Sequence, residues 1–219
     1  MVEIYDEHEQ SEIVKKWLRD NGSAIVMGLV IAFGGLFGFK QWQGWQESNR
    51  QQASIEYEVM DQLLATNQVD AAMANFQNLR DQHADSPYTS MAALKMARAR
   101  IGLKQPDLAI GLYNYVIENG YPRALSVVAR ERLARVLLDQ GRAEEAHQTL
   151  DGAADIRGFE ARFAEVRGDI LLAQGRNADA AVAYREALAQ LEAGVGDRGK
   201  LEMKLQALGA ATAEGGAES

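Results

Sequence analysis

The chain has 219 residues, a formal net charge of −8 and no cysteine. The acidic balance argues against nucleic-acid binding and against attachment to anionic lipid through a basic patch, because both require clustered Lys and Arg. The lack of cysteine excludes disulfides, thiol catalysis and thiolate metal sites. Only three prolines, and a composition dominated by Ala, Leu, Glu, Gln and Arg, favour an all-α fold.

A long uncharged stretch follows a polar N-terminal stub over residues 1–21. From Asn21 to Phe39 there are 19 residues without a charge. As a helix they span about 28 Å, close to the ~30 Å hydrocarbon core of a bilayer. We therefore predict a transmembrane helix over 22–39. The alternatives are a buried core helix, which would keep a polar stripe, and a cleaved signal peptide, which would have a small-residue cleavage site.

Tryptophans flank the predicted span. Trp17 precedes it, and Trp42 and Trp45 follow it. Indole rings favour the headgroup layer of the bilayer, so we expect these residues to act as interfacial anchors. Lys and Arg are slightly more numerous just before the span than just after it. The positive-inside rule then predicts a cytoplasmic N-terminus and a translocated C-terminal domain, periplasmic in a Gram-negative bacterium.

Small residues recur within the predicted span at helical spacing. Candidates for packing against a neighbouring membrane helix are Ala24, Gly28, Ala32, Gly34, Gly35 and Gly38. Most of them share one face, which favours close approach of another helix. The alternative, that glycine is simply common in membrane helices, stays open.

The chain after residue 40 contains an internal repeat. The block Leu138–Ala146 recurs 34 residues later as Leu172–Ala180, which is the tetratricopeptide period. Earlier copies are centred on Ala72 and Ala109, and an apolar residue lies four positions after each of the four alanines. These apolar residues are Phe76, Tyr113, Leu150 and Tyr184.

Small residues at Ala134 and Gly168 occupy the slot where the first helix of a repeat packs closely on the second. Gly141 and Gly175 suit the turn between the two helices. We predict a linking helix over 40–63 that runs into a tetratricopeptide-like α-solenoid over 64–208. The solenoid is expected to end in a capping helix with Leu201, Leu205 and Leu208 inward, before a disordered tail over 209–219.

Catalytic and metal-binding motifs are absent from the sequence, so no cofactor is expected. The polar surroundings of His83 and His147 predict solvent-facing side chains. In a solenoid of this kind the first helix of each repeat lines the groove. The candidate groove residues are Val128, Glu131, Arg135, Leu138, Arg162, Glu165, Asp169 and Leu172. They suit contact with extended polypeptide, or alternatively form a solvated face with ion pairs such as Glu131–Arg135.

Short motifs in the N-terminal stub, the repeat blocks and the final helix point to one family. They are Glu3-Ile-Tyr5, Val14-Lys-Lys-Trp17, Asn21-Gly22, Leu133-Ala-Arg-Val136, Arg167-Gly-Asp-Ile-Leu-Leu172 and Met203-Lys-Leu205. Through them the chain resembles the YfgM family, the ancillary subunits of the bacterial SecYEG translocon, from residue 1 to about 208. The N-terminal stub is the most specific match, because a general repeat protein has no reason to share it.

The resemblance implies a single-pass protein of the bacterial inner membrane, with its N-terminus in the cytoplasm and its repeat domain in the periplasm. It also implies association with the SecYEG translocon and with PpiD, a membrane-anchored prolyl isomerase, and assistance to unfolded exported proteins. It implies no catalytic residues. Two other interpretations stay open: a membrane-tethered scaffold for another cell-envelope complex, and an enzyme, which would show convergent carboxylates of raised pKa.

Overall fold

The computed structural model describes residues 7–191 and 197–215, and every regular element within these ranges is an α-helix. The predicted all-α fold is therefore confirmed. The described helices are α1 (Glu7–Ala65), α2 (Val69–Gln82), α3 (Pro87–Gly102), α4 (Pro106–Asn119), α5 (Arg123–Asp139), α6 (Ala143–Asp151), α7 (Glu160–Ala173), α8 (Asn177–Ala189) and α9 (Arg198–Gly215). The chain divides into two compact units, Met1–Gln52 and Ala53–Ser219.

The first unit contains most of α1, and the apolar part of this helix remains exposed. Residues 23–45 are exposed without exception. The most apolar window of the helix has a mean hydropathy of 2.0, and none of it is buried. A soluble fold would cover such a surface, so the stretch fits a membrane-spanning helix and not the buried core helix considered as an alternative.

The second unit begins inside α1, at Ala53. Ala53 and Met60 are completely buried in the same hydrophobic cluster as α2, so the last turns of α1 form the first helix of the first repeat. The predicted span over 22–39 and the predicted linking helix over 40–63 are parts of the single helix α1, and the compact unit that holds the repeats begins at Ala53. The sequence gives no signal for this boundary, because no Gly or Pro interrupts residues 45–65.

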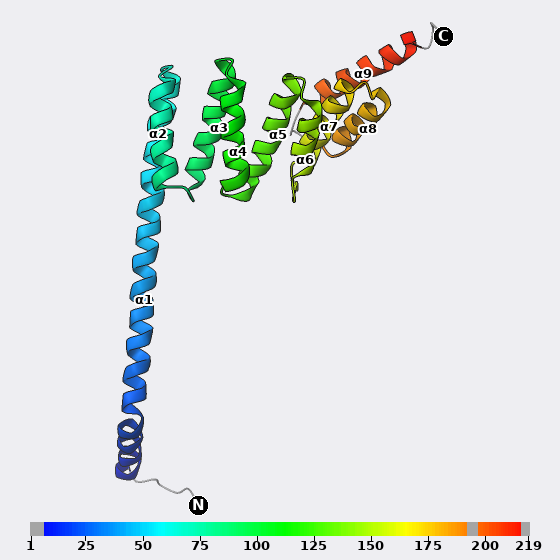
Figure 1. Ribbon diagram of the computed structural model, residues 1–219. Helices are drawn as coiled ribbons and strands as arrows, with labels where there is room; N and C mark the ends of the chain where they lie inside the picture. Colours follow the sequence, from blue (N-terminus) through cyan, green and yellow to red (C-terminus); the bar gives the residue numbers. More distant parts are fainter. Residues whose placement is uncertain (1–6, 192–196, 216–219) are drawn as a thin grey trace, which may run out of the picture. The chain divides into compact units, whose positions relative to one another are not determined.

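In the described part of the second unit, four helix pairs precede α9, and each pair consists of the first and the second helix of a repeat. The last turns of α1 are followed by α2, and the other pairs are α3 with α4, α5 with α6, and α7 with α8. Figure 1 shows α3 to α8 as successive neighbours, with α9 packed on the last pair. The predicted tetratricopeptide-like arrangement is thus the one observed.

The repeat positions named from the sequence are core positions. All four alanines of the pattern are completely buried: Ala72, Ala109, Ala146 and Ala180. The apolar residues four positions later are also buried, with at most 4% of their surface exposed: Phe76, Tyr113, Leu150 and Tyr184. The first copy, centred on Ala72, therefore packs like the later ones, and its buried surface joins that of the second and third copies in one core.

Each first helix ends in the same hydrogen-bonded turn. A residue in the left-handed region follows the helix in every repeat: Asn67, Lys104, Gly141 and Gly175, with φ of 61°, 58°, 75° and 75°. The next amide donates to a carbonyl five residues back, as Arg142 N does to Leu137 O at 2.9 Å. This is the Schellman arrangement, which favours glycine because a Cβ is strained at positive φ.

The second repeat carries lysine where the third and fourth carry glycine, so Lys104→Gly is expected to stabilise the chain. Relief of left-handed strain should raise the free energy of unfolding by about 1 kcal/mol. Urea unfolding of the detergent-solubilised chain, followed by circular dichroism at 222 nm, measures the change. Gly141→Lys is the matched reverse change and should cost a similar amount. A less stable Lys104→Gly variant would contradict the role assigned to this turn.

The final helix caps the repeats and is longer than predicted. Leu201 and Leu208 are buried and Leu205 is half-buried, as the sequence indicated. The helix continues to Gly215, beyond the predicted end of the repeat domain at Leu208. The disorder predicted for the tail over 209–219 stays a prediction. Ala-rich segments have high helix propensity even without apolar side chains to bury. Residues 216–219 lie outside the described part of the chain.

The prediction of two solvent-facing histidines is wrong for His83. This residue ends α2 and is only 4% exposed, because it lies in the turn against α3. Its carbonyl accepts a hydrogen bond from Thr89 Oγ1 at 2.6 Å. His147 is partly exposed and its Nδ1 lies 3.0 Å from Asp151 Oδ2. A polar sequence neighbourhood does not reveal tertiary burial in a turn.

Candidate functional site

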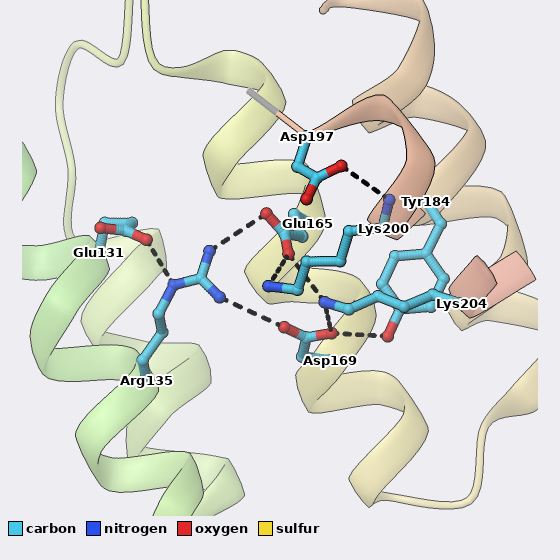
Figure 2. A network of polar contacts seen from close by, with 8 residues as sticks. All are labelled: Glu131, Arg135, Glu165, Asp169, Tyr184, Asp197, Lys200 and Lys204. Atoms are coloured by element: carbon cyan, nitrogen blue, oxygen red, sulfur yellow. Dashed lines mark hydrogen bonds and ion pairs between the residues drawn. The ribbon is translucent and has the colours of Figure 1, made fainter. Parts of the chain in front are cut away.

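The candidate groove residues lie on the first helices of the last two repeats. Glu131 and Arg135 are one turn apart on α5, and Glu165 and Asp169 are one turn apart on α7. Residues spaced by four share a helix face, so each pair projects from one side of its helix. Figure 2 shows that the two pairs point toward each other and are joined by Arg135. The structure thus brings together four of the five charged residues singled out from the sequence.

Arg135 is the centre of these contacts. Its Nε donates to Glu131 Oε1 at 2.5 Å, and its Nη2 donates to Glu165 Oε2 at 3.3 Å. Its Nη1 lies 3.5 Å from Asp169 Oδ2. One guanidinium therefore bridges three carboxylates from two successive repeats. The i,i+4 ion pair Glu131–Arg135, weighed above as an alternative to a binding groove, is present and extends across the repeat boundary.

Helix α9 supplies two lysines to the same carboxylates. Lys204 Nζ donates to Glu165 Oε1 at 2.8 Å and to Asp169 Oδ1 at 2.6 Å, while Lys200 Nζ lies 3.1 Å from Glu165 Oε1. Tyr184 Oη of α8 donates to Asp169 Oδ1 at 2.7 Å. We call these groups the ion network; its members are Glu131, Arg135, Glu165, Asp169, Tyr184, Lys200 and Lys204 (Figure 2).

Sequence reasoning missed three members of the network. Tyr184 was assigned an apolar role from the repeat pattern, but its ring is buried while its hydroxyl reaches Asp169. The repeat pattern predicts a capping helix that contains Lys200 and Lys204, but it assigns these two lysines no partners. Their spacing of four, beside the inward-facing Leu201, was the available signal that they share the packed side of α9.

The contacts within the network favour the charged forms of Glu165 and Arg135. Burial alone would raise the pKa of the Glu165 carboxyl, but hydrogen bonding from Lys204 and the charge of Arg135 outweigh it and lower the pKa to about 2. Burial would likewise lower the pKa of Arg135, but Glu131 reverses this and the pKa is raised. Burial and the contact with Asp169 raise the pKa of the Tyr184 phenol. A carboxylate held ionised in this way is unsuited to general acid catalysis, for which the pKa must rise toward neutrality.

A cavity of about 370 Å³ lies beside the network. Glu131, Arg135 and Glu165 line it together with Arg162, the fifth of the charged residues singled out from the sequence. Its apolar wall comes from Phe159, Leu191 and Leu201. Three carboxylates and three cations balance within the network itself, so what this region offers a partner is a cavity with an apolar wall and a neutralised edge.

The structure places the predicted interfacial tryptophans and small packing residues on α1, but among the described residues it shows no second helix against them. Trp17, Trp42 and Trp45 are more than half exposed on α1. A Cβ added at Gly28 or Gly35 would meet no atom within 4 Å, so packing inside the chain does not require glycine there. The packing face and the interfacial anchors therefore remain predictions.

Comparison with known proteins covers both the membrane helix and the repeats. A family model described as a tetratricopeptide repeat-like domain matches residues 15–210. Among curated proteins, one from Aggregatibacter actinomycetemcomitans is 28% identical over 210 residues, which is 95% of this chain and 100% of the relative. Relatives from Haemophilus influenzae and Escherichia coli are 28% and 27% identical, covering 84% and 80% of this chain and 90% and 84% of their own length.

All three relatives bear the name ancillary SecYEG translocon subunit. Proteins of this kind, with a tetratricopeptide repeat-like domain, are non-catalytic. The match begins within the segment that precedes the apolar span and ends inside α9, so it includes every repeat described above. The chain therefore belongs to the tetratricopeptide repeat-like family of YfgM proteins, as its sequence motifs predicted.

Proposed function

We propose that this chain is a non-enzymatic ancillary subunit of the Sec translocon, anchored in the inner membrane by α1. The observation that carries the proposal is that relatives with this name align with 80–95% of the chain, apolar helix and repeats together. The exposed apolar window of α1 supports the anchor, since nothing in the described fold covers it. The depressed pKa of Glu165 supports a non-catalytic role for the charged site.

The repeat domain is proposed to lie in the periplasm and the N-terminus in the cytoplasm. The support is the excess of basic residues at Lys15, Lys16 and Arg19, before the span, over Lys40 after it. Because the chain has no cysteine, a single introduced thiol reports its own location. A membrane-impermeant maleimide, applied after permeabilising the outer membrane, should label Met203→Cys on α9 and spare Glu12→Cys. The opposite labelling pattern would reverse the orientation.

Partner recognition is proposed to use both units. The small-residue face of the membrane helix would contact a translocon helix, since interfaces between membrane helices are built on close backbone approach. The groove side of the repeats would contact PpiD and unfolded exported proteins. Leu172 supports the second part, because it is 42% exposed at the end of the helix that carries Glu165 and Asp169. An internally neutralised charge network beside exposed aliphatics suits weak contact with many sequences.

Replacing residues 22–39 by an unrelated transmembrane sequence is expected to reduce recovery of translocon subunits about tenfold in a pulldown under mild detergent. Gly28→Leu with Gly35→Leu should act in the same way, because bulky side chains prevent close helix approach. Val26→Leu with Phe33→Leu is the matched control on other faces and should leave recovery unchanged.

Each outcome of the pulldown assigns a role. Recovery that survives the helix replacement would move recognition to the repeat domain and overturn the proposed small-residue face. Failure of the unaltered chain to recover any translocon subunit or PpiD, while it recovers a different envelope complex, would replace the Sec role with that of a scaffold.

A further inference from the structure

The last helix, α9, lies in a groove formed by α7 and α8. Its Leu201, Leu205 and Leu208 join an apolar cluster that is separate from the main core of the repeats. On α7 and α8 the buried members of this cluster are four alanines, one leucine and one tyrosine: Ala164, Leu171, Ala180, Ala183, Tyr184 and Ala187. Leucines spaced by four and three on one helix, seated against alanines on two others, are the packing by which a groove receives an amphipathic helix.

One edge of the α7–α8 groove carries several carboxylates, and lysines of α9 pair with them. Glu131, Glu165 and Asp169 supply three carboxylates, and among the described side chains of the repeats Arg135 pairs with all three. Lys200 and Lys204 of α9 add the two charges that balance this edge. Without α9 these four paired groups would carry a net charge of −2, which favours a helix with two cations one turn apart.

Helix α9 fills the groove incompletely. Of its described side chains only Leu201 and Leu208 are buried, against six buried residues on α7. Leu201 borders the cavity of about 370 Å³ on one side. Leu205 and Leu208 line a second, open cavity of about 480 Å³ together with Val182, which is 60% exposed. Larger apolar side chains on a bound helix would fill space that α9 leaves open.

We propose that the α7–α8 groove is a docking site for a basic amphipathic helix of a partner protein, and that α9 occupies this site as an internal competitor. The partner helix carries two basic residues spaced by four, at the places of Lys200 and Lys204. It carries large aliphatic or aromatic residues at the places of Leu201, Leu205 and Leu208. Docking displaces α9 and exposes its leucines. The inference stands independently of the Sec-associated role.

Peptide binding to the full chain in detergent tests this competition. The probe is a fluorescein-labelled peptide with the sequence of residues 197–209, measured by fluorescence anisotropy. Lys200→Ala with Lys204→Ala weakens the internal competitor, so the peptide should bind this variant about tenfold more tightly than the unaltered chain. Adding Glu165→Gln and Asp169→Asn to that variant should abolish the gain, because the peptide's lysines lose their acceptors.

Arg198→Ala is the matched control, because Arg198 pairs with Glu202 on the exposed side of the same helix. It should leave the affinity unchanged. Equal affinity of the double-lysine variant and the unaltered chain, at equal helix content by circular dichroism, would overturn the proposal. So would a gain that survives the Glu165 and Asp169 changes.

A second measurement keeps α9 and its lysines intact. Leu201→Cys places the chain's single thiol at a position that is 2% exposed. Excess unlabelled peptide should speed alkylation of this thiol by maleimide, because the displaced helix exposes it. A peptide with both lysines replaced by glutamate should have no effect. An alkylation rate that the basic peptide leaves unchanged would overturn the proposal even if the double-lysine variant failed to fold.

Discussion

Gly168→Ala is expected to lower the free energy of unfolding of the repeat domain by about 1–3 kcal/mol, although alanine is the better helix former. The reason is the contact between α7 and α8. A Cβ at position 168 would lie 2.6 Å from Cδ1 of the Tyr184 ring. That ring is completely buried, and its hydroxyl is fixed on Asp169, so it cannot rotate away. Urea unfolding of the solubilised chain measures the loss.

Gly111→Ala on α4 is the matched control for this prediction. It makes the same chemical change at a helical glycine whose added Cβ would meet no atom within 4 Å. Higher helix propensity should therefore raise the free energy of unfolding by about 0.5–1 kcal/mol. If both substitutions shifted stability in the same direction, the close α7–α8 approach described here would be wrong.

Arg135→Met is expected to cost about 2–3 kcal/mol of stability. It removes the group shared by Glu131, Glu165 and Asp169, and Glu131 is only 6% exposed. A buried carboxylate without its cation retains the cost of desolvation. This expected loss of stability is smaller than for a fully buried ion pair, because 32% of the Arg135 side chain is exposed to solvent. Arg142→Met breaks an exposed pair with Glu145 and should change stability little.

The same network predicts how stability depends on pH. The pKa of Glu165 falls from 4.5 to about 2 in the folded chain. A carboxyl group whose pKa is lowered by folding contributes stability above its unfolded pKa and loses it as the pH falls toward the folded value. Stability should therefore decline between these two pH values. The decline should be shallower in Arg135→Met, because Arg135 is one cause of the lowered pKa of Glu165. An identical decline would show that Arg135 does not lower this pKa.

The repeat core could be predicted from sequence because the same steric requirement recurs at the equivalent position of each repeat. An alanine such as Ala146 must be small where two helices touch, and Gly168 must be smaller still under a tyrosine ring. The left-handed turn also recurs, but Asn67 and Lys104 take the place of glycine in the first two copies. The first two copies are therefore harder to recognise from the sequence. Local periodicity carries this information without knowledge of tertiary contacts.

The remaining features depend on contacts between segments that are distant in sequence. The repeat domain starts at Ala53 because Met60 is buried against later helices, not because the helix breaks there. Lys204 belongs to the charged site through Glu165, 39 residues away. The sequence placed Glu131, Arg135, Glu165 and Asp169 on one face but could not show that α9 neutralises them.

Photocrosslinking in living cells tests the central claim, that this chain works at the translocon, most directly. A benzophenone amino acid is placed at Ile31, beside the small-residue face of α1, or at Leu172 on the groove side of the repeats. The account predicts that Ile31 yields an adduct with a translocon subunit and that Leu172 yields adducts with PpiD or exported proteins. Adducts from both positions that contain only components of an unrelated envelope complex would contradict it.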